Sequence, residues 1–172
     1  MSGRFLTILV LIFAAVFSRL VPHPWNLTAM GSVALFAGSY LRPRLLAWLV
    51  PLVAFLISDF ILGLHSTIFF AYGALALITG LGIWGLKKPT ALSVFALSLT
   101  SSLLFFLTTN FGVWWVDNFY PPTLAGLLQC FAMAIPFFKG QIIGDLFFSM
   151  VLFGSYELIS RKIFQSQRQT LS

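Results

Sequence analysis

The sequence predicts an all-α membrane protein, a polytopic helical bundle forming one domain over residues 1–172. The first observation behind this prediction is composition: 59% of the residues are hydrophobic and only 8% are charged. Soluble domains carry about 25% charged residues, which they need to cover their surface. The second observation is that long apolar segments alternate with short loops in which basic residues gather. Together these observations exclude a water-soluble domain.

The distribution of basic residues predicts a topology, because Lys and Arg in short loops mark the cytoplasmic side. Eight of the ten basic residues lie at the chain ends or in every second gap between apolar segments: Arg4, Arg42, Arg44, Lys87, Lys88, Arg161, Lys162 and Arg168. We therefore expect a multi-pass protein of the cell (inner) membrane with both termini cytoplasmic and an even number of crossings. Arg19 and Lys139 fall on the other side, which makes them candidates for a functional role.

Seven apolar segments follow one another, at 5–18, 27–41, 45–62, 67–86, 91–109, 123–138 and 140–160. A helical span needs about 20 residues, so the first two must use flanking residues or a locally thinner bilayer. The first segment has the basic start of a signal peptide, but its cleavage site is poorly formed, and we expect an uncleaved helix. Small residues four apart predict close helix packing, at Ala34 and Gly38, at Ala76 and Gly80, and at Gly140 and Gly144.

The segment 123–138 is short, contains Pro136, and is separated from the last segment only by Lys139 and Gly140. Seven crossings would place the C-terminal basic residues outside and break the charge pattern. We therefore expect six transmembrane helices, with 123–138 as an additional re-entrant or interfacial segment on the outer side. An extension of the last helix is the alternative.

Polar residues in or beside membrane spans are costly and tend to mark function, and here they gather in the outer half. Aromatic side chains of the expected loop 110–122 accompany them, as in pockets for small organic molecules. We expect a substrate-binding site among Arg19, His23, Asn26, Asp59, His65, Asn110, Trp114, Gln141 and Asp145. The alternative for the two acids is a purely structural pairing with Arg19 or Lys139, which would also satisfy a carboxylate near hydrocarbon.

Signals for catalysis, metals and nucleic acids are weak. The sequence has no Gly-x-Ser-x-Gly elbow, His-Glu-x-x-His motif or phosphate-binding glycine loop. The single cysteine, Cys130, excludes an internal disulfide and a thiolate-rich zinc site. A metal site of His23, Asp59 and His65 would rest on nonspecific spacing. We expect no enzyme, no catalytic or metal-binding residues and no cofactor. We also expect no nucleic-acid partner, because the basic residues are spread over several loops.

Several motifs together resemble an uncharacterised bacterial family of proposed integral-membrane transport proteins. They are the segment 19–30 with its Pro-His-Pro, Ser58-Asp59 with Leu62-Gly63-Leu64-His65, Asn110-Phe111-Gly112-Val113-Trp114, and Pro136-Phe137-Phe138 with Gly144-Asp145. More distantly, the size and the six-span layout are similar to those of the S components of energy-coupling-factor transporters. That resemblance implies capture of a vitamin-like molecule near the outer face. Those S components dock through an Ala-x-x-x-Ala motif, where this chain has Ala14 and Ser18.

We therefore expect a membrane transport protein that binds a small organic molecule in an outward-facing pocket. Its expected partners are this substrate, membrane lipid, and an energising transporter module or further copies of the chain. One alternative is an ion- or proton-coupled permease in which Asp59 and Asp145 carry the coupling charge. A second is a membrane-embedded enzyme that acts on a lipid or isoprenoid through Asp59, His65 and Asp145. A structural subunit without a pocket is the third.

Overall fold

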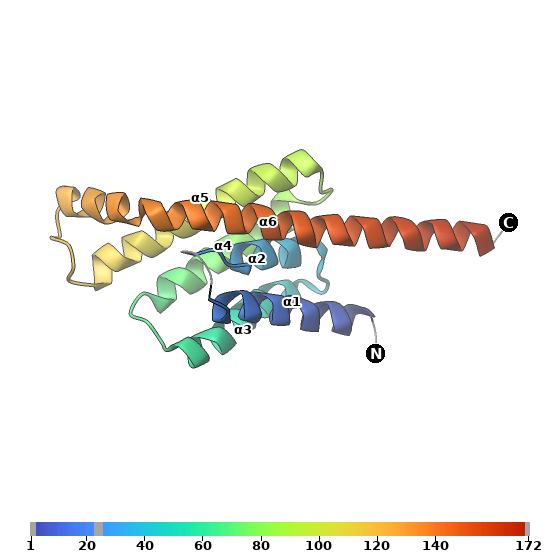
Figure 1. The fold of residues 1–172 in the computed structure, drawn as a ribbon, viewed down its shortest axis with the longest axis horizontal. Coiled ribbons are helices and arrows are strands. Elements are labelled where there is room, and N and C mark those ends of the chain that lie inside the picture. Colours follow the sequence, from blue (N-terminus) through green and yellow to red (C-terminus); the bar gives the residue numbers. More distant parts are fainter. Residues whose placement is uncertain (1–2, 23–25, 171–172) are drawn as a thin grey trace.

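The protein is all-helical in a computed structural model that describes the backbone of residues 3–22 and 26–170 and the side chains of 6–22 and 26–160. The described residues form six α-helices and no strand (Figure 1). These are α1 (Gly3–Leu20), α2 (Met30–Tyr40), α3 (Arg44–Leu62), α4 (Ile68–Gly85), α5 (Ala91–Val116) and α6 (Leu124–Thr170). The predicted all-α helical bundle is confirmed.

Four of the described helices, α3 to α6, are long and apolar enough to cross a membrane. In α1 the apolar stretch that the structure describes is shorter, at Leu6–Leu20. The 11 residues of α2 measure about 17 Å at about 1.5 Å per residue, roughly half of a hydrocarbon core about 30 Å thick. The described helices therefore fit a membrane protein, and six complete crossings remain a prediction.

Basic loops and polar loops occupy opposite ends of the bundle. The start of α1, the end of α6, and the loops α2–α3 and α4–α5 lie at one end, here called the basic end because it carries Arg42, Arg44, Lys87 and Lys88 (Figure 1). The loops 63–67 and 117–123 lie at the other end, here called the far end, and residues 21–22 and 26–29 connect α1 and α2 at the ends of these helices that point toward it. The two loops are joined there, since Ser66 Oγ donates a hydrogen bond of 2.6 Å to Asp117 Oδ1. The relative arrangement of the loops thus follows the predicted alternation of charge.

Helix α2 is the centre of the bundle. Ten of its 11 residues are buried, and it packs against each of the other five helices. A Cβ at Gly38 would collide with the backbone oxygen of Thr79, and one at Gly82 with that of Leu35. Helices α2 and α4 therefore meet backbone to backbone. The predicted role of Gly38 in close packing is confirmed, and its neighbour on α4 is Gly82.

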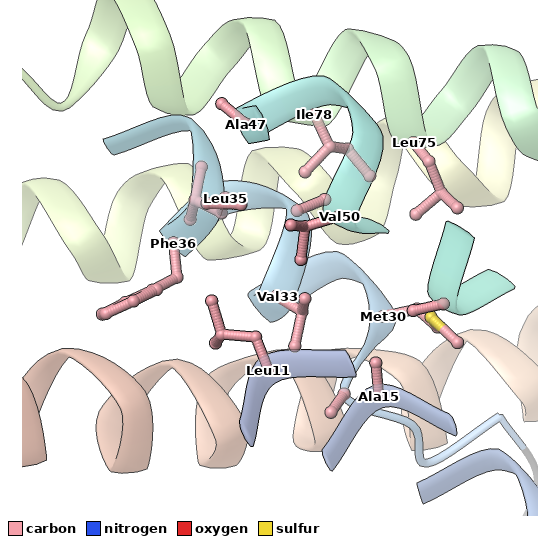
Figure 2. Close-up of a cluster of buried hydrophobic side chains, with 14 of the residues drawn as sticks. Leu11, Ala15, Met30, Val33, Leu35, Phe36, Ala47, Val50, Leu75 and Ile78 are labelled. Carbon is pink, nitrogen blue, oxygen red and sulfur yellow. The ribbon is translucent and has the colours of Figure 1, made fainter. Parts of the chain in front are cut away.

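The apolar core surrounds α2 on several sides (Figure 2). Its labelled members come from four helices: Leu11 and Ala15 of α1, Met30, Val33, Leu35 and Phe36 of α2, Ala47 and Val50 of α3, and Leu75 and Ile78 of α4. Lipid tails are as apolar as these side chains, so close van der Waals packing holds such a core together, rather than expulsion of water.

The prediction of a separate re-entrant or interfacial segment at 123–138 is wrong. Helix α6 begins at Leu124 and continues through Pro136 and Lys139, so this segment is the extension of the last helix. Its 47 residues measure about 70 Å at about 1.5 Å per residue, and the helix projects beyond the bundle at the basic end (Figure 1). Pro136 removes one hydrogen bond, but packing against α5 continues on both sides of it.

Packing between α5 and α6 explains why both helices extend further than expected. The ring of Phe106 stacks on Phe138 at 4.4 Å and also meets Phe131. Cys130 Sγ donates to the backbone oxygen of Asn110. Residues 110–116, expected in an aromatic loop, are therefore the last turns of α5, and the connecting loop covers only 117–123.

A candidate ligand-binding pocket at the far end

A cavity of about 290 Å³ at the far end brings together most of the predicted site residues. This volume is at the lower edge of the roughly 300–1,000 Å³ typical of small-molecule sites. Its walls include six of the nine predicted residues: Arg19, Asn26, His65, Asn110, Gln141 and Asp145. Thr28, Thr67 and Thr109 add hydroxyls, and Phe55, Phe105, Phe106 and Phe137 add aromatic rings. We call this cavity the far-end pocket.

Arg19 is held by α3. Its Nη1 lies 2.6 Å from Asp59 Oδ1 and donates to Ser58 Oγ at 2.6 Å, and the guanidinium carbon lies 4.1 Å from the centre of the Phe55 ring. The predicted pairing of Arg19 with an acid is confirmed for Asp59. Because Asp59 is fully buried behind Arg19, it supports the pocket and does not line it.

The second oxygen of Asp59 has no hydrogen-bond partner. His65 Nε2 lies 3.9 Å from Oδ2, while His65 Nδ1 lies 3.0 Å from Thr67 Oγ1. The buried hydroxyl of Tyr72 makes no hydrogen bond of good geometry, but it lies close enough to Asp59 to interact with its carboxylate. Tyr72 is a neighbour that sequence reasoning missed, since aromatic residues near span ends are usually interfacial anchors.

Asp145 is stabilised without an ion pair. It is 2% exposed, and no basic side chain that the structure describes lies within salt-bridge distance of it. Ser102 Oγ donates to its Oδ2 at 2.7 Å, and the Ser32 backbone N–H and the Gln141 amide are also in reach. Lys139 is exposed. Pairing of Asp145 with Arg19 or Lys139, the structural alternative, is therefore wrong.

The N-terminus of α2 takes the place of a cation beside Asp145. A helix N-terminus carries a partial positive charge and unpaired N–H groups. Gly31, in the first turn of α2, approaches so closely that a Cβ there would collide with the Asp145 carboxylate. Ser32 Oγ donates to the backbone oxygen of Asp145 at 2.8 Å. Asp145 thus joins α2, α5 and α6 at the base of the far-end pocket.

Trp114 is a predicted residue that lies elsewhere. Trp114 does not line the pocket, because its Nε1 donates to the backbone oxygen of Pro121 at 2.9 Å and anchors the α5–α6 loop. The phenylalanine rings of the pocket take the role expected of this tryptophan. His23 is outside the described residues. Within the part of the chain that is described, no three His, Cys, Asp or Glu side chains form a group that could hold a metal ion.

Buried serines are the main feature that sequence reasoning missed. Ser98 Oγ donates to Ser149 Oγ at 2.8 Å, and Ser149 Oγ donates to Ser32 Oγ at 3.2 Å. Together with Ser102 they form a layer of hydroxyls beside Asp145. A usable signal was present, since Ser98 and Ser102 are four residues apart, as are Asp145 and Ser149, so each pair shares a helix face.

Comparison with known proteins gives a family without a known activity. The model of DUF6580, a family of unknown function, matches residues 1–169. The chain belongs to DUF6580. The expectation of an uncharacterised family is thereby confirmed. No curated protein and no solved structure matches this DUF6580 protein.

Proposed function

We propose that this DUF6580 protein is a membrane transport protein that binds a small organic, vitamin-like molecule in the far-end pocket. The strongest support is that polar residues far apart in the sequence come together around one cavity. Six of the predicted polar residues, spread from Arg19 to Asp145, line one cavity together with three threonines and four phenylalanines. A bundle that used these polar groups only to join helices would have no need to leave a cavity among them.

The lining favours a small polar or zwitterionic molecule. Amides of Asn26, Asn110 and Gln141 offer both donors and acceptors, and phenylalanine rings would exclude water from the bound molecule. Asp59 neutralises Arg19, so the walls carry no excess of positive charge. If the basic end is cytoplasmic, as the charge rule predicts, the pocket faces outward and captures its substrate from outside.

An energy source would have to come from elsewhere. The chain lacks a phosphate-binding glycine loop, so uptake against a gradient would need an energising transporter module or a coupled ion. The ion- or proton-coupled permease stays a second candidate because of Asp145. This carboxylate is held by neutral donors and a helix N-terminus, and no described cation would compete with a proton for it.

The enzyme alternative has less support. It requires Asp59, His65 and Asp145 to act on one substrate. Arg19 covers Asp59, whereas Asp145 lies against the start of α2 on another wall. We therefore retain binding without catalysis as the proposal.

Ligand screening of the purified protein tests the proposal. Vitamins, nucleobases, amines and metal ions would be added singly while the melting temperature is recorded. A ligand at about 100 times its Kd stabilises the native state by about 2.7 kcal/mol, a clearly measurable shift. We expect a ligand that raises the melting temperature of the wild type but not that of Gln141→Leu, which removes a pocket amide at similar volume.

The matched control, Thr100→Leu, lies on the exposed face of α5 and should respond like the wild type. A complete lack of hits, or hits that survive in Gln141→Leu, would contradict the proposal.

A further inference from the structure

A second cavity, of about 680 Å³, lies between α5 and α6 at the basic end. Most of its wall is apolar and includes Val94, Phe95 and Phe153. It reaches Thr90 and Glu157 near the end of the bundle, and Ser98 and Ser149 in the interior. We call it the basic-end cavity.

The two cavities lie in line along α5. The basic-end cavity uses the stretch from Thr90 to Ser98, and the far-end pocket uses the stretch from Phe105 to Val113. At about 1.5 Å per residue, the distance from 90 to 113 is about 35 Å, which matches the roughly 30 Å of a hydrocarbon core. The cavities together therefore follow α5 across a full membrane thickness.

A layer of small polar side chains lies between the stretches of α5 and α6 that line the two cavities. It has two tiers, the pair Ser98–Ser149 with 2.8 Å between hydroxyl oxygens and the pair Ser102–Asp145 at 2.7 Å. In both helices the tiers are four residues apart, about one helical turn or 5.4 Å, because α5 and α6 are antiparallel. The first tier lines the basic-end cavity, and Asp145 lines the far-end pocket.

Helix α2 connects the two tiers through one side chain. Ser32 Oγ donates to the backbone oxygen of Asp145 at 2.8 Å and accepts from Ser149 at 3.2 Å. No bulky apolar side chain takes part in these pairings. Interhelical hydrogen bonds of this kind contribute only about 0.6 kcal/mol on average inside a membrane protein. The hydrogen bonds of this layer therefore hold it together only weakly.

We propose that the two cavities are the halves of one solute pathway between α5 and α6, closed in this structure by the layer of Ser98, Ser149, Ser102 and Asp145. The inference rests on the proposed transport function and adds the route and its gate. Asp145 and Glu157 place carboxylates on the walls, whereas Arg19 at the far end is paired with Asp59. Charges that line a pore select the ions that pass, so the pathway favours small cations and neutral polar solutes over anions.

A leak assay tests this gate without knowledge of the substrate. The variant Ser98→Gly/Ser102→Gly/Ser149→Gly removes the hydroxyls of both tiers and keeps Asp145. It would be purified, reconstituted into phosphatidylcholine vesicles, and compared with the wild type for efflux of rubidium and chloride ions. We expect rubidium efflux at least about tenfold faster than in the wild type, with chloride unchanged, because carboxylates line the opened route. The matched control is Ser101→Gly, which removes a buried serine that bonds back to the Leu97 carbonyl and lines neither cavity.

Thiol labelling provides a second measurement that does not depend on the triple variant remaining intact. In a Cys130→Ala background, Thr90→Cys, at an exposed position that lines the basic-end cavity, should react with a membrane-impermeant thiol reagent added from the basic end. Ser102→Cys should react from that side only after Ser98 and Ser149 are both changed to Gly.

These two measurements test the pathway independently of the ligand screen, which tests the proposed function. Unchanged rubidium efflux in a folded triple variant, an equal leak in Ser101→Gly, or no gain of labelling at position 102 would overturn the pathway, even if the screen finds a ligand. A leak in the triple variant supports the pathway even if the screen finds none.

Discussion

Arg19 Nη1 lies 2.6 Å from Asp59 Oδ1, so a pair of opposite charges joins the last turn of α1 to the last turn of α3. This pair explains one of the two basic residues that break the alternation of charge. A lone charge inside a membrane protein is costly, whereas a paired one is tolerated. The pair also places the guanidinium over Phe55, at the wall of the far-end pocket.

Breaking this pair should destabilise the protein, and removing both partners should not. Asp59→Ala leaves Arg19 without its counter-charge, and Arg19→Ala leaves a fully buried carboxylate. Loss of one partner of a buried pair costs about 3–5 kcal/mol, whereas an apolar replacement of both is often neutral. The free energy of unfolding in detergent should therefore fall for each single variant and recover in Arg19→Met/Asp59→Leu. Additive losses in the double variant would contradict this. Asp59→Ala is consequently unsuitable as a test of ligand binding.

The close approach of α2 and α4 makes a second prediction. In Gly38→Ala the new methyl group meets the Thr79 carbonyl, and overpacking of this kind costs about 1–3 kcal/mol. Gly73→Ala is the matched control, because a Cβ at this helical position of α4 meets nothing within 4 Å. Replacing a helical glycine by alanine there should be neutral or stabilise by up to about 1 kcal/mol. Thermal unfolding of both variants measures the difference, and equal melting temperatures would argue against backbone-to-backbone packing.

The charge pattern predicts which end of the bundle faces the cytoplasm. A reporter fused after Arg168 should behave as cytoplasmic, and a cysteine replacing Lys87 should resist impermeant thiol reagents in intact cells. Ser66→Cys, in the far-end loop that contacts Asp117, should react. Labelling of position 87 from outside would reverse the orientation and turn the far-end pocket toward the cytoplasm.

Trp114 should prove an anchor and not a ligand contact. Trp114→Phe keeps an aromatic ring but loses the hydrogen bond to the Pro121 carbonyl, which is worth about 1 kcal/mol. A small loss of stability with unchanged ligand affinity is the expected result. An affinity loss larger than that of Gln141→Leu would return Trp114 to the binding site.

Much of the fold could be predicted from the sequence because its determinants act residue by residue. Hydropathy located the helices, and the alternation of Arg and Lys placed the loops at their relative ends. The expectation that a proline interrupts a helix is wrong at Pro136. There, packing of Phe106 against Phe131 and Phe138 keeps α6 continuous. The same packing keeps residues 110–116 helical.

The site could be predicted only in part, for a physical reason. Polar side chains such as Arg19, Asn110 and Gln141 are conspicuous in apolar segments, so composition alone identifies them. One stabilising partner of Asp145 is the N-terminus of α2, and a helix N-terminus is a feature of the backbone that no residue type marks in the sequence. The pairing of Ser98 with Ser149 depends on the register between α5 and α6, which one sequence does not reveal.

Ligand affinity in pocket variants tests the central claim most directly. The tightest ligand from the screen would be titrated calorimetrically into the wild type, Asn110→Leu and Thr100→Leu. Asn110 lines the far-end pocket, and Leu replaces its amide by an apolar group of the same branched shape. We predict one bound molecule per chain in the wild type and in Thr100→Leu, and a Kd at least about tenfold higher in Asn110→Leu, equivalent to about 1.4 kcal/mol. An unchanged Kd in a folded Asn110→Leu protein would contradict binding in the far-end pocket.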